Sequence, residues 1–285
     1  MPRTLLAAAL LTPLLAAALA TPAAAAPSID RYVAMGDSFA AVGTLTDVRP
    51  APLGCARATD NYPSGVAARI NPAQFVDVSC GGAQVRDLSS PQDVAFGPNP
   101  AQYEALTAGT DLVTVTIGGN DVGFGEIIST CARLSFSDPL GSPCKRHFTS
   151  GGTDVLGERI AALGPQITEV VAQIRARSPQ AQVIVVGYLR ILPPRGGCWP
   201  VVPFAFGDVP HFAAVQDNLN ATIGRHATAA GATFVNPGVT TGHDVCKSAD
   251  VKWVEGLIPT SLSVPVHPNA RGQAHVAAIT ADAVG

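Results

Sequence analysis

One serine stands where a nucleophile could work, directly after a short apolar run near the start of the chain. Ser38 follows residues 32–36 and Asp37, so its hydroxyl is expected at the carboxyl end of a buried strand. A hydroxyl in that place is held by rigid backbone and lies near main-chain N–H groups that begin the next helix. Such a serine also needs a histidine base and donors for a developing oxyanion.

Two further predicted strand ends carry short sequences that could supply those donors. Gly82 follows the apolar run 75–78, and Asn120 follows the run 112–117. Ligands of open α/β sheets bind outside the carboxyl ends of the strands, where these residues are expected to meet. The main-chain N–H groups of Ser38 and Gly82 and the side-chain amide of Asn120 could therefore form an oxyanion hole.

Two of the six histidines are serious candidates for the base. His267 lies just before the last predicted helix, and Pro268 suits the first turn of that helix. A loop-to-helix position can hold an imidazole over the strand edge. His243 is the competitor, because Asp244 stands beside it.

The elements that must position these residues alternate along the chain. Short apolar and β-branched runs predict strands, and helical patterns fall between them. The strands are expected at 32–35, 75–78, 112–117, 183–186 and 233–235, and the helices at 61–69, 100–108, 160–174, 212–230 and 269–284. Gly164-Pro165 is expected to kink or restart the third helix. This alternation predicts an α/β fold with a parallel sheet between two helical layers.

Composition and the chain ends limit the class of protein. Residues 1–26 have a positive start, an Ala/Leu-rich core and a small-residue end, which predicts a secretory signal peptide. Residues 27–285 fit a single domain. No later apolar run reaches the length of a membrane span. The 18 basic residues are scattered and the formal net charge is −3, which argues against a nucleic-acid partner.

The six cysteines predict disulfides rather than a metal site in an exported protein. They form no Cys-x-x-Cys motif, and no histidine lies at zinc-finger spacing from them. Sequential pairing closes the shortest loops, which predicts Cys55–Cys80, Cys131–Cys144 and Cys198–Cys246. Asp37 and Asp121 are expected to cap turns rather than to bind a metal.

The ordered motifs resemble the SGNH (GDSL-type) hydrolases. Gly36-Asp37-Ser38, Gly82, Gly118-Gly119-Asn120-Asp121 and His267-Pro268 look like the four blocks of that family. Cys80-Gly81-Gly82-Ala83, Gly242-His243-Asp244-Val245-Cys246 and the six cysteines are similar to its secreted bacterial lipase, phospholipase A1 and esterase branch. The resemblance implies a three-layer, flavodoxin-like α/β/α sandwich with a central five-stranded parallel sheet. It also implies a Ser38–His267 mechanism without metal or cofactor, with Gly82 and Asn120 as oxyanion donors.

The chain departs from the family pattern at one position. Family members usually place an aspartate three residues before the histidine, and here that residue is Val264. A carboxylate normally orients the imidazole. We expect the main-chain carbonyl of Val264 or Pro265 to accept the Nδ1 proton of His267 instead, with Asp244 as the rival group.

These observations predict a secreted, monomeric serine ester hydrolase that cleaves acyl esters of lipids or small alcohols. Aromatic residues in the long irregular stretch 192–210 could wall an acyl pocket or form a covering loop pinned by Cys198. One alternative is a carbohydrate esterase that removes acetyl or aryl groups. Another is a non-catalytic secreted binding protein, although the intact Ser38, Asn120 and His267 speak against it.

Overall fold

Five parallel strands form one sheet at the centre of the molecule. The computed structural model describes residues 28–285, and the predicted signal peptide at 1–26 lies outside them. The strand order is β2-β1-β3-β4-β5, and every neighbouring pair is parallel. The strands are β1 (Arg31–Gly36), β2 (Gln74–Asp77), β3 (Leu112–Thr116), β4 (Gln182–Val186) and β5 (Thr233–Val235). The predicted α/β fold with a five-stranded parallel sheet is confirmed.

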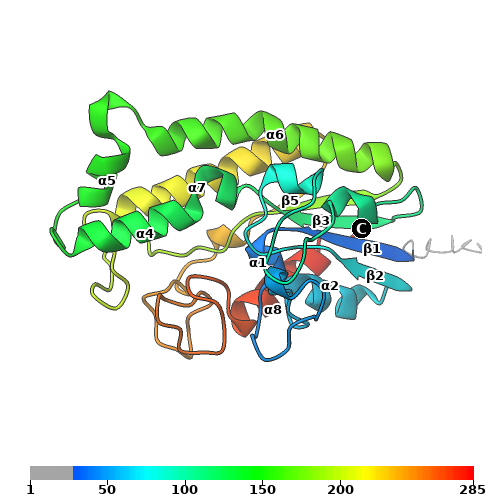
Figure 1. Ribbon diagram of the computed structural model, residues 1–285, viewed down its shortest axis with the longest axis horizontal. Coiled ribbons are helices and arrows are strands. Elements are labelled where there is room, and N and C mark those ends of the chain that lie inside the picture. The colour runs from blue at the N-terminus through cyan, green and yellow to red at the C-terminus, as the bar shows by residue number, and fades with distance from the viewer. Residues whose placement is uncertain (1–27) are drawn as a thin grey trace, which may run out of the picture.

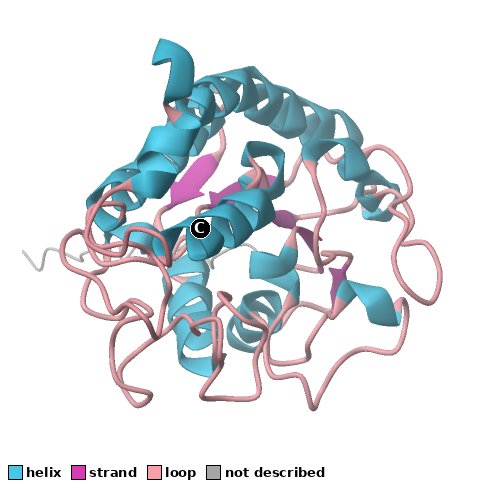
Figure 2. Cartoon of the chain, turned by 60° about the vertical axis from the view of Figure 1, so that its left-hand side comes forward, coloured by secondary structure: helices cyan, strands magenta, loops and turns pink. Residues whose placement is uncertain are grey.

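Helices cover both faces of this sheet. Helix α6 (Val155–Arg177) packs against α7 (Val209–Ala229) on one face, and α2 (Tyr62–Ile70) packs against α8 (Ala270–Ala281) on the other. Figure 1 shows these two layers above and below the sheet, and Figure 2 shows the strands enclosed between helices. Strand β3 is buried along its whole length because it is covered on both faces.

Shorter helices follow the carboxyl ends of β1 and β3. Helix α1 (Ser38–Ala41) begins directly after β1, and α3 (Gly119–Val122) follows β3. Helices α4 (Phe124–Ser135) and α5 (Pro143–Phe148) then lead to α6. The sequence patterns did not predict α4 or α5. The three disulfides are Cys55–Cys80, Cys131–Cys144 and Cys198–Cys246.

Two helix predictions were wrong in detail. The predicted helix at 100–108 is only a short 3-10 turn, Gln102–Ala105. Nine residues make a marginal helix, and the Gln102 side chain instead binds both main-chain groups of Gly36. Helix α6 runs through Pro165, so the predicted restart was wrong, and the alternative of a kink there stays a prediction. Pro165 lies on the exposed side of α6, where water can bind the carbonyl that the missing N–H leaves unpaired.

The helices of residues 28–285 are too short or too polar to span a membrane.

Candidate active site

The carboxyl ends of β1, β2 and β3 are joined by main-chain contacts. The Cys80 N–H donates to the Gly36 carbonyl at 2.9 Å, and the Asp37 N–H donates to the Thr116 carbonyl at 2.8 Å. Gly36 has a φ of +134°, and a Cβ there would lie 2.3 Å from the Thr116 carbonyl oxygen. Only glycine allows β1 to approach β3 this closely before the chain turns into α1.

Ser38 and His267 meet at this edge although 229 residues separate them. The distance from His267 Nε2 to Ser38 Oγ is 2.7 Å. His267 Nδ1 lies 2.7 Å from the Pro265 carbonyl oxygen. A carbonyl can only accept a hydrogen bond, so Nδ1 must carry the proton and Nε2 must be the acceptor from the serine hydroxyl. This tautomer is the one that a general base requires.

A tight turn places the Pro265 carbonyl against the imidazole. The His267 N–H donates to the Val264 carbonyl, which closes a turn over residues 264–267. Val266 occupies its third position with a φ of +60°. A turn of this type usually has glycine there, and a β-branched residue in the left-handed region is strained. Of the two carbonyls proposed from sequence, Pro265 therefore faces the ring and Val264 binds the backbone.

Aromatic rings hold the imidazole from the side. The Phe39 ring lies 5.3 Å from His267 and the Phe124 ring 6.3 Å from it, measured between centroids. Burial among these groups lowers the pKa of His267 below its ordinary value, and the bond to Pro265 opposes part of that effect. Burial thus favours the neutral imidazole.

A buried acid that sequence analysis passed over organises the loop before His267. The Glu255 carboxylate pairs with Lys252 at 2.7 Å. It also accepts hydrogen bonds from the Thr260 N–H at 2.8 Å, the Ser261 hydroxyl at 2.8 Å and the Asn269 amide at 2.9 Å. Both Lys252 and Glu255 are buried. Glu255 thus joins the two ends of the segment that carries His267.

Hydrogen bonds hold the turn that carries Gly82 against the turn that carries Asn120, two of the predicted oxyanion donors. The main-chain N–H groups of Ser38 and Gly82 bond to no acceptor in the described part of the chain. The Asn120 amide donates to the Ala83 carbonyl at 2.9 Å, which leaves its second hydrogen available. The Gln84 amide donates back to the Asn120 carbonyl at 3.1 Å. The turn after β2 and the turn after β3 therefore hold each other.

A buried hydrogen-bond bridge links the turn that carries Ser38 to the turn that carries Asn120. The Tyr188 hydroxyl, after β4, donates to Asp37 Oδ2 at 2.6 Å and accepts from the Gly119 N–H at 2.7 Å. The Phe39 N–H donates to Asp37 Oδ1 at 2.9 Å, so Asp37 caps α1. Burial raises the pKa of Asp37 to about 7, although the bonds from Tyr188 and Phe39 oppose this rise. Tyr188 was not among the candidates from sequence.

The other candidates from sequence are His243, Asp244 and Asp121. Each bonds to a main-chain group and not to Ser38 or His267. His243 stacks on Trp253 at 3.7 Å, and its Nδ1 lies 2.7 Å from the Val251 carbonyl oxygen. The Asp244 carboxylate accepts the Cys246 N–H at 3.1 Å, and it makes no hydrogen bond to His267. Asp121 accepts the Val85 N–H. No cluster of potential metal ligands occurs within residues 28–285.

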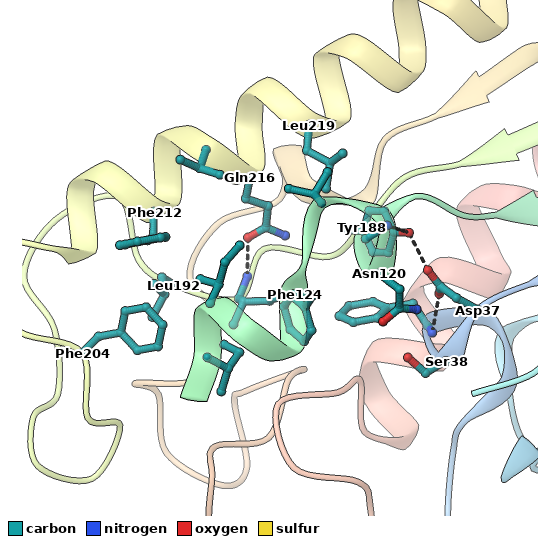
Figure 3. Close-up of a pocket in the computed structure, with 17 residues that line it drawn as sticks. Asp37, Ser38, Asn120, Phe124, Tyr188, Leu192, Phe204, Phe212, Gln216 and Leu219 are labelled. Atoms are coloured by element: carbon teal, nitrogen blue, oxygen red, sulfur yellow. Dashed lines mark hydrogen bonds between the residues drawn. The ribbon is translucent and has the colours of Figure 1, made fainter. Parts of the chain in front are cut away.

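An apolar pocket extends from Ser38 between α4, α7 and the loop after β4. Its volume is about 80 Å³. Figure 3 shows Ser38, Asp37 and Asn120 at one end and Phe204 and Phe212 at the other. The side chains between them include Phe124, Leu192 and Leu219, and the amide of Gln216 is occupied by main-chain groups of Leu189 and Ile191. Hence the walls offer almost only apolar contacts.

Comparison with known proteins places this geometry in a family. The profile of the GDSL-like Lipase/Acylhydrolase family matches residues 34–275. A lipase of Streptomyces coelicolor, Lipase 2, is 42% identical over 267 residues, which cover 92% of this chain and 88% of that protein.

Two solved structures agree with that match. Phospholipase A1 from Streptomyces albidoflavus has a TM-score of 0.74 and 26% identity, over 90% of this chain and all of that one. An extracellular lipase from Streptomyces rimosus has a TM-score of 0.66 and 27% identity, over 90% and 99% of the two chains. The chain therefore belongs to the GDSL-like lipase/acylhydrolase family and is a carboxylic ester hydrolase.

Proposed function

We propose that Ser38 and His267 form a catalytic dyad that cleaves acyl esters through an acyl-enzyme. The observation that carries this proposal is the 2.7 Å contact between Nε2 and Oγ, with the tautomer fixed by Pro265. Nε2 takes the hydroxyl proton while Oγ attacks the ester carbonyl. The imidazolium then gives that proton to the leaving alcohol. Water repeats the attack and releases the acid, which restores Ser38.

The oxyanion of each tetrahedral intermediate needs donors on the face opposite the base. In this proposal it accepts hydrogen bonds from the Ser38 and Gly82 N–H groups and from the Asn120 amide. The polar groups of Asp37 and Tyr188 bond to each other and to main-chain N–H groups, so they are not among the donors to the oxyanion. This bridge fixes the start of α1 relative to the start of α3, so the nucleophile and the Asn120 donor keep a fixed separation.

The pocket favours an acyl group as the part of the substrate bound beyond Ser38. Apolar walls stabilise methylene groups by about 0.8 kcal/mol each, which corresponds to roughly fourfold in binding. The pocket volume of about 80 Å³ leaves room for several such groups. A short to medium acyl chain fits this space. An acetyl group would fill only a small part of this pocket, which argues against a carbohydrate acetyl esterase.

We further propose that the protein acts outside the cell as a monomer, on lipid or small-molecule esters and without nucleic acid. Three disulfides are typical of exported proteins. The dyad, the donors and the pocket all come from one chain, so a single copy suffices. The proposed steps use only groups of this chain and call for no cofactor.

Labelling with a fluorophosphonate tests the role of Ser38. We expect the folded protein to take up one phosphonyl group, found by mass spectrometry on the peptide that contains Ser38. The Ser38→Ala variant and heat-denatured protein should take up none. An unlabelled Ser38 in folded protein, or equal labelling of Ser38→Ala, would contradict the proposed nucleophile.

A series of p-nitrophenyl esters tests the role of the pocket. We expect kcat/KM to rise about fourfold per methylene until the acyl chain fills the pocket. Val215 lines the pocket from α7, so Val215→Phe should lower kcat/KM for octanoate at least tenfold and spare acetate. Ala214 is exposed on the same helix, and Ala214→Phe is the matched control. Equal losses for acetate and octanoate in Val215→Phe would contradict an acyl pocket.

A further inference from the structure

Exposed apolar side chains gather at one end of the molecule, away from Ser38. Four of the ten large apolar residues exposed within residues 28–285 lie in two segments, 133–146 and 195–206. They are Phe136, Leu140, Val201 and Phe206. We call these two segments the tip. Isolated exposed apolar residues are ordinary on a protein surface, but a contiguous group marks an interaction site.

The tip is a preformed surface. The Phe206 N–H donates to the Pro139 carbonyl at 2.8 Å, and the Gly207 N–H donates to the Gly141 carbonyl at 2.9 Å. The Phe136 and Trp199 rings contact each other edge to face, with centroids 6.0 Å apart. Disulfides fix each segment to the rest of the chain, at Cys144 and Cys198. Figure 1 shows α4, α5 and the loop before α7 together at this end.

The charge of the tip is opposite to that of the chain. Arg133, Lys145 and Arg195 are exposed, and none pairs with a carboxylate among the described residues. The tip's own acid, Asp138, is paired with Arg146 at 2.7 Å. The whole chain nevertheless has a formal net charge of −3. A local excess of positive charge on an acidic protein is complementary to an anionic partner.

We infer that the tip binds the surface of anionic phospholipids. Aromatic and leucine side chains enter the boundary between headgroups and acyl chains, while neighbouring basic groups are attracted to anionic headgroups. The loop that exposes Val201 and Phe206 also turns Leu192 and Phe204 into the pocket. The surface and the acyl pocket thus share one wall. This inference rests on the tip residues and does not require the proposed dyad.

Co-sedimentation with vesicles of diether phospholipids tests the inference, because these lipids carry no ester that the wild-type protein could cleave. We expect binding to vesicles of phosphatidylglycerol and phosphatidylcholine, weaker binding to phosphatidylcholine alone, and loss of binding as salt increases. The double variant Phe136→Asp/Leu140→Asp and the triple variant Arg133→Gln/Lys145→Gln/Arg195→Gln should each reduce binding at least tenfold. Phe96, exposed elsewhere, provides the control Phe96→Asp, which should bind like wild type.

Hydrolysis of a soluble ester, measured for each variant without vesicles, reports whether the variant is folded, and we expect it to be retained. Several results would overturn the inference. One is that the wild-type protein does not bind, and another is that its binding is independent of lipid charge and of salt concentration. A third is that Phe96→Asp loses as much vesicle binding as the tip variants. Light scattering adds one more. A wild-type dimer that becomes a monomer in Phe136→Asp/Leu140→Asp would identify the tip as a contact between two copies of this chain.

Discussion

The variant His267→Ala should lose about 10²- to 10⁴-fold in kcat/KM for an acyl ester, whereas Asp244→Asn should stay within about twofold of wild type. The imidazole is the only group within hydrogen-bond distance of Ser38 Oγ among the described residues. Asp244 instead accepts the Cys246 N–H, and an asparagine oxygen can do the same. Steady-state kinetics on one soluble ester, with circular dichroism to confirm folding, measures both effects.

This pair of variants separates two ways of orienting a catalytic histidine. In a triad, loss of the acid alone lowers kcat by about 10⁴-fold because the imidazole adopts the wrong tautomer. Here the Pro265 carbonyl sets the tautomer, and no side-chain substitution removes it. A loss in Asp244→Asn comparable to that in His267→Ala would show that a carboxylate orients the base after all.

The strands could be predicted well from the sequence because a buried parallel strand is a continuous run of apolar or β-branched residues. The run 112–117 is apolar or β-branched throughout, and β3 occupies nearly all of it. Helix α4, Phe124–Ser135, was missed although its buried residues recur at helical spacing. Three of its side chains, Phe124, Ile127 and Ile128, line the pocket, so the pocket could be suspected only from the later loop at 192–210.

Within the site, the sequence likewise reveals residues that follow a local pattern and misses those that act through long-range contacts. Ser38, Gly82 and Asn120 could be placed together because each follows a strand of one parallel sheet. The bond from Tyr188 to Asp37 spans 151 residues, and no local pattern marks a tyrosine that will reach a strand end on the far side of β3. Glu255 was overlooked for a related reason. Glu255 lies well before His267 in the chain, and no local pattern marks a carboxylate that will bond to the Asn269 amide on the other side of that histidine.

Removing the Glu255 charge is expected to give the largest loss of stability. Glu255→Gln leaves the buried Lys252 ammonium without its carboxylate, which typically costs about 3 to 5 kcal/mol in the free energy of unfolding. The glutamine amide would also face donors that now bond to the carboxylate. Urea denaturation measures the loss. The double variant Lys252→Met/Glu255→Gln removes the unpaired charge and should recover most of it. A double variant no more stable than Glu255→Gln would contradict the buried-pair explanation.

The pH dependence of stability provides an independent check on the same pair. Burial alone would raise the pKa of Glu255, but the bonds from Lys252, Asn269, Thr260 and Ser261 outweigh it and lower the pKa from 4.5 to about 2. A carboxyl whose pKa is lower in the folded state stabilises the protein above its unfolded pKa, and this contribution disappears as pH falls through the folded value. Wild-type stability should therefore fall more steeply between about pH 4.5 and pH 2 than that of Lys252→Met/Glu255→Gln. Parallel curves for the two proteins over this range would mean that the Glu255 carboxylate contributes no such stability, because every other carboxyl is common to both.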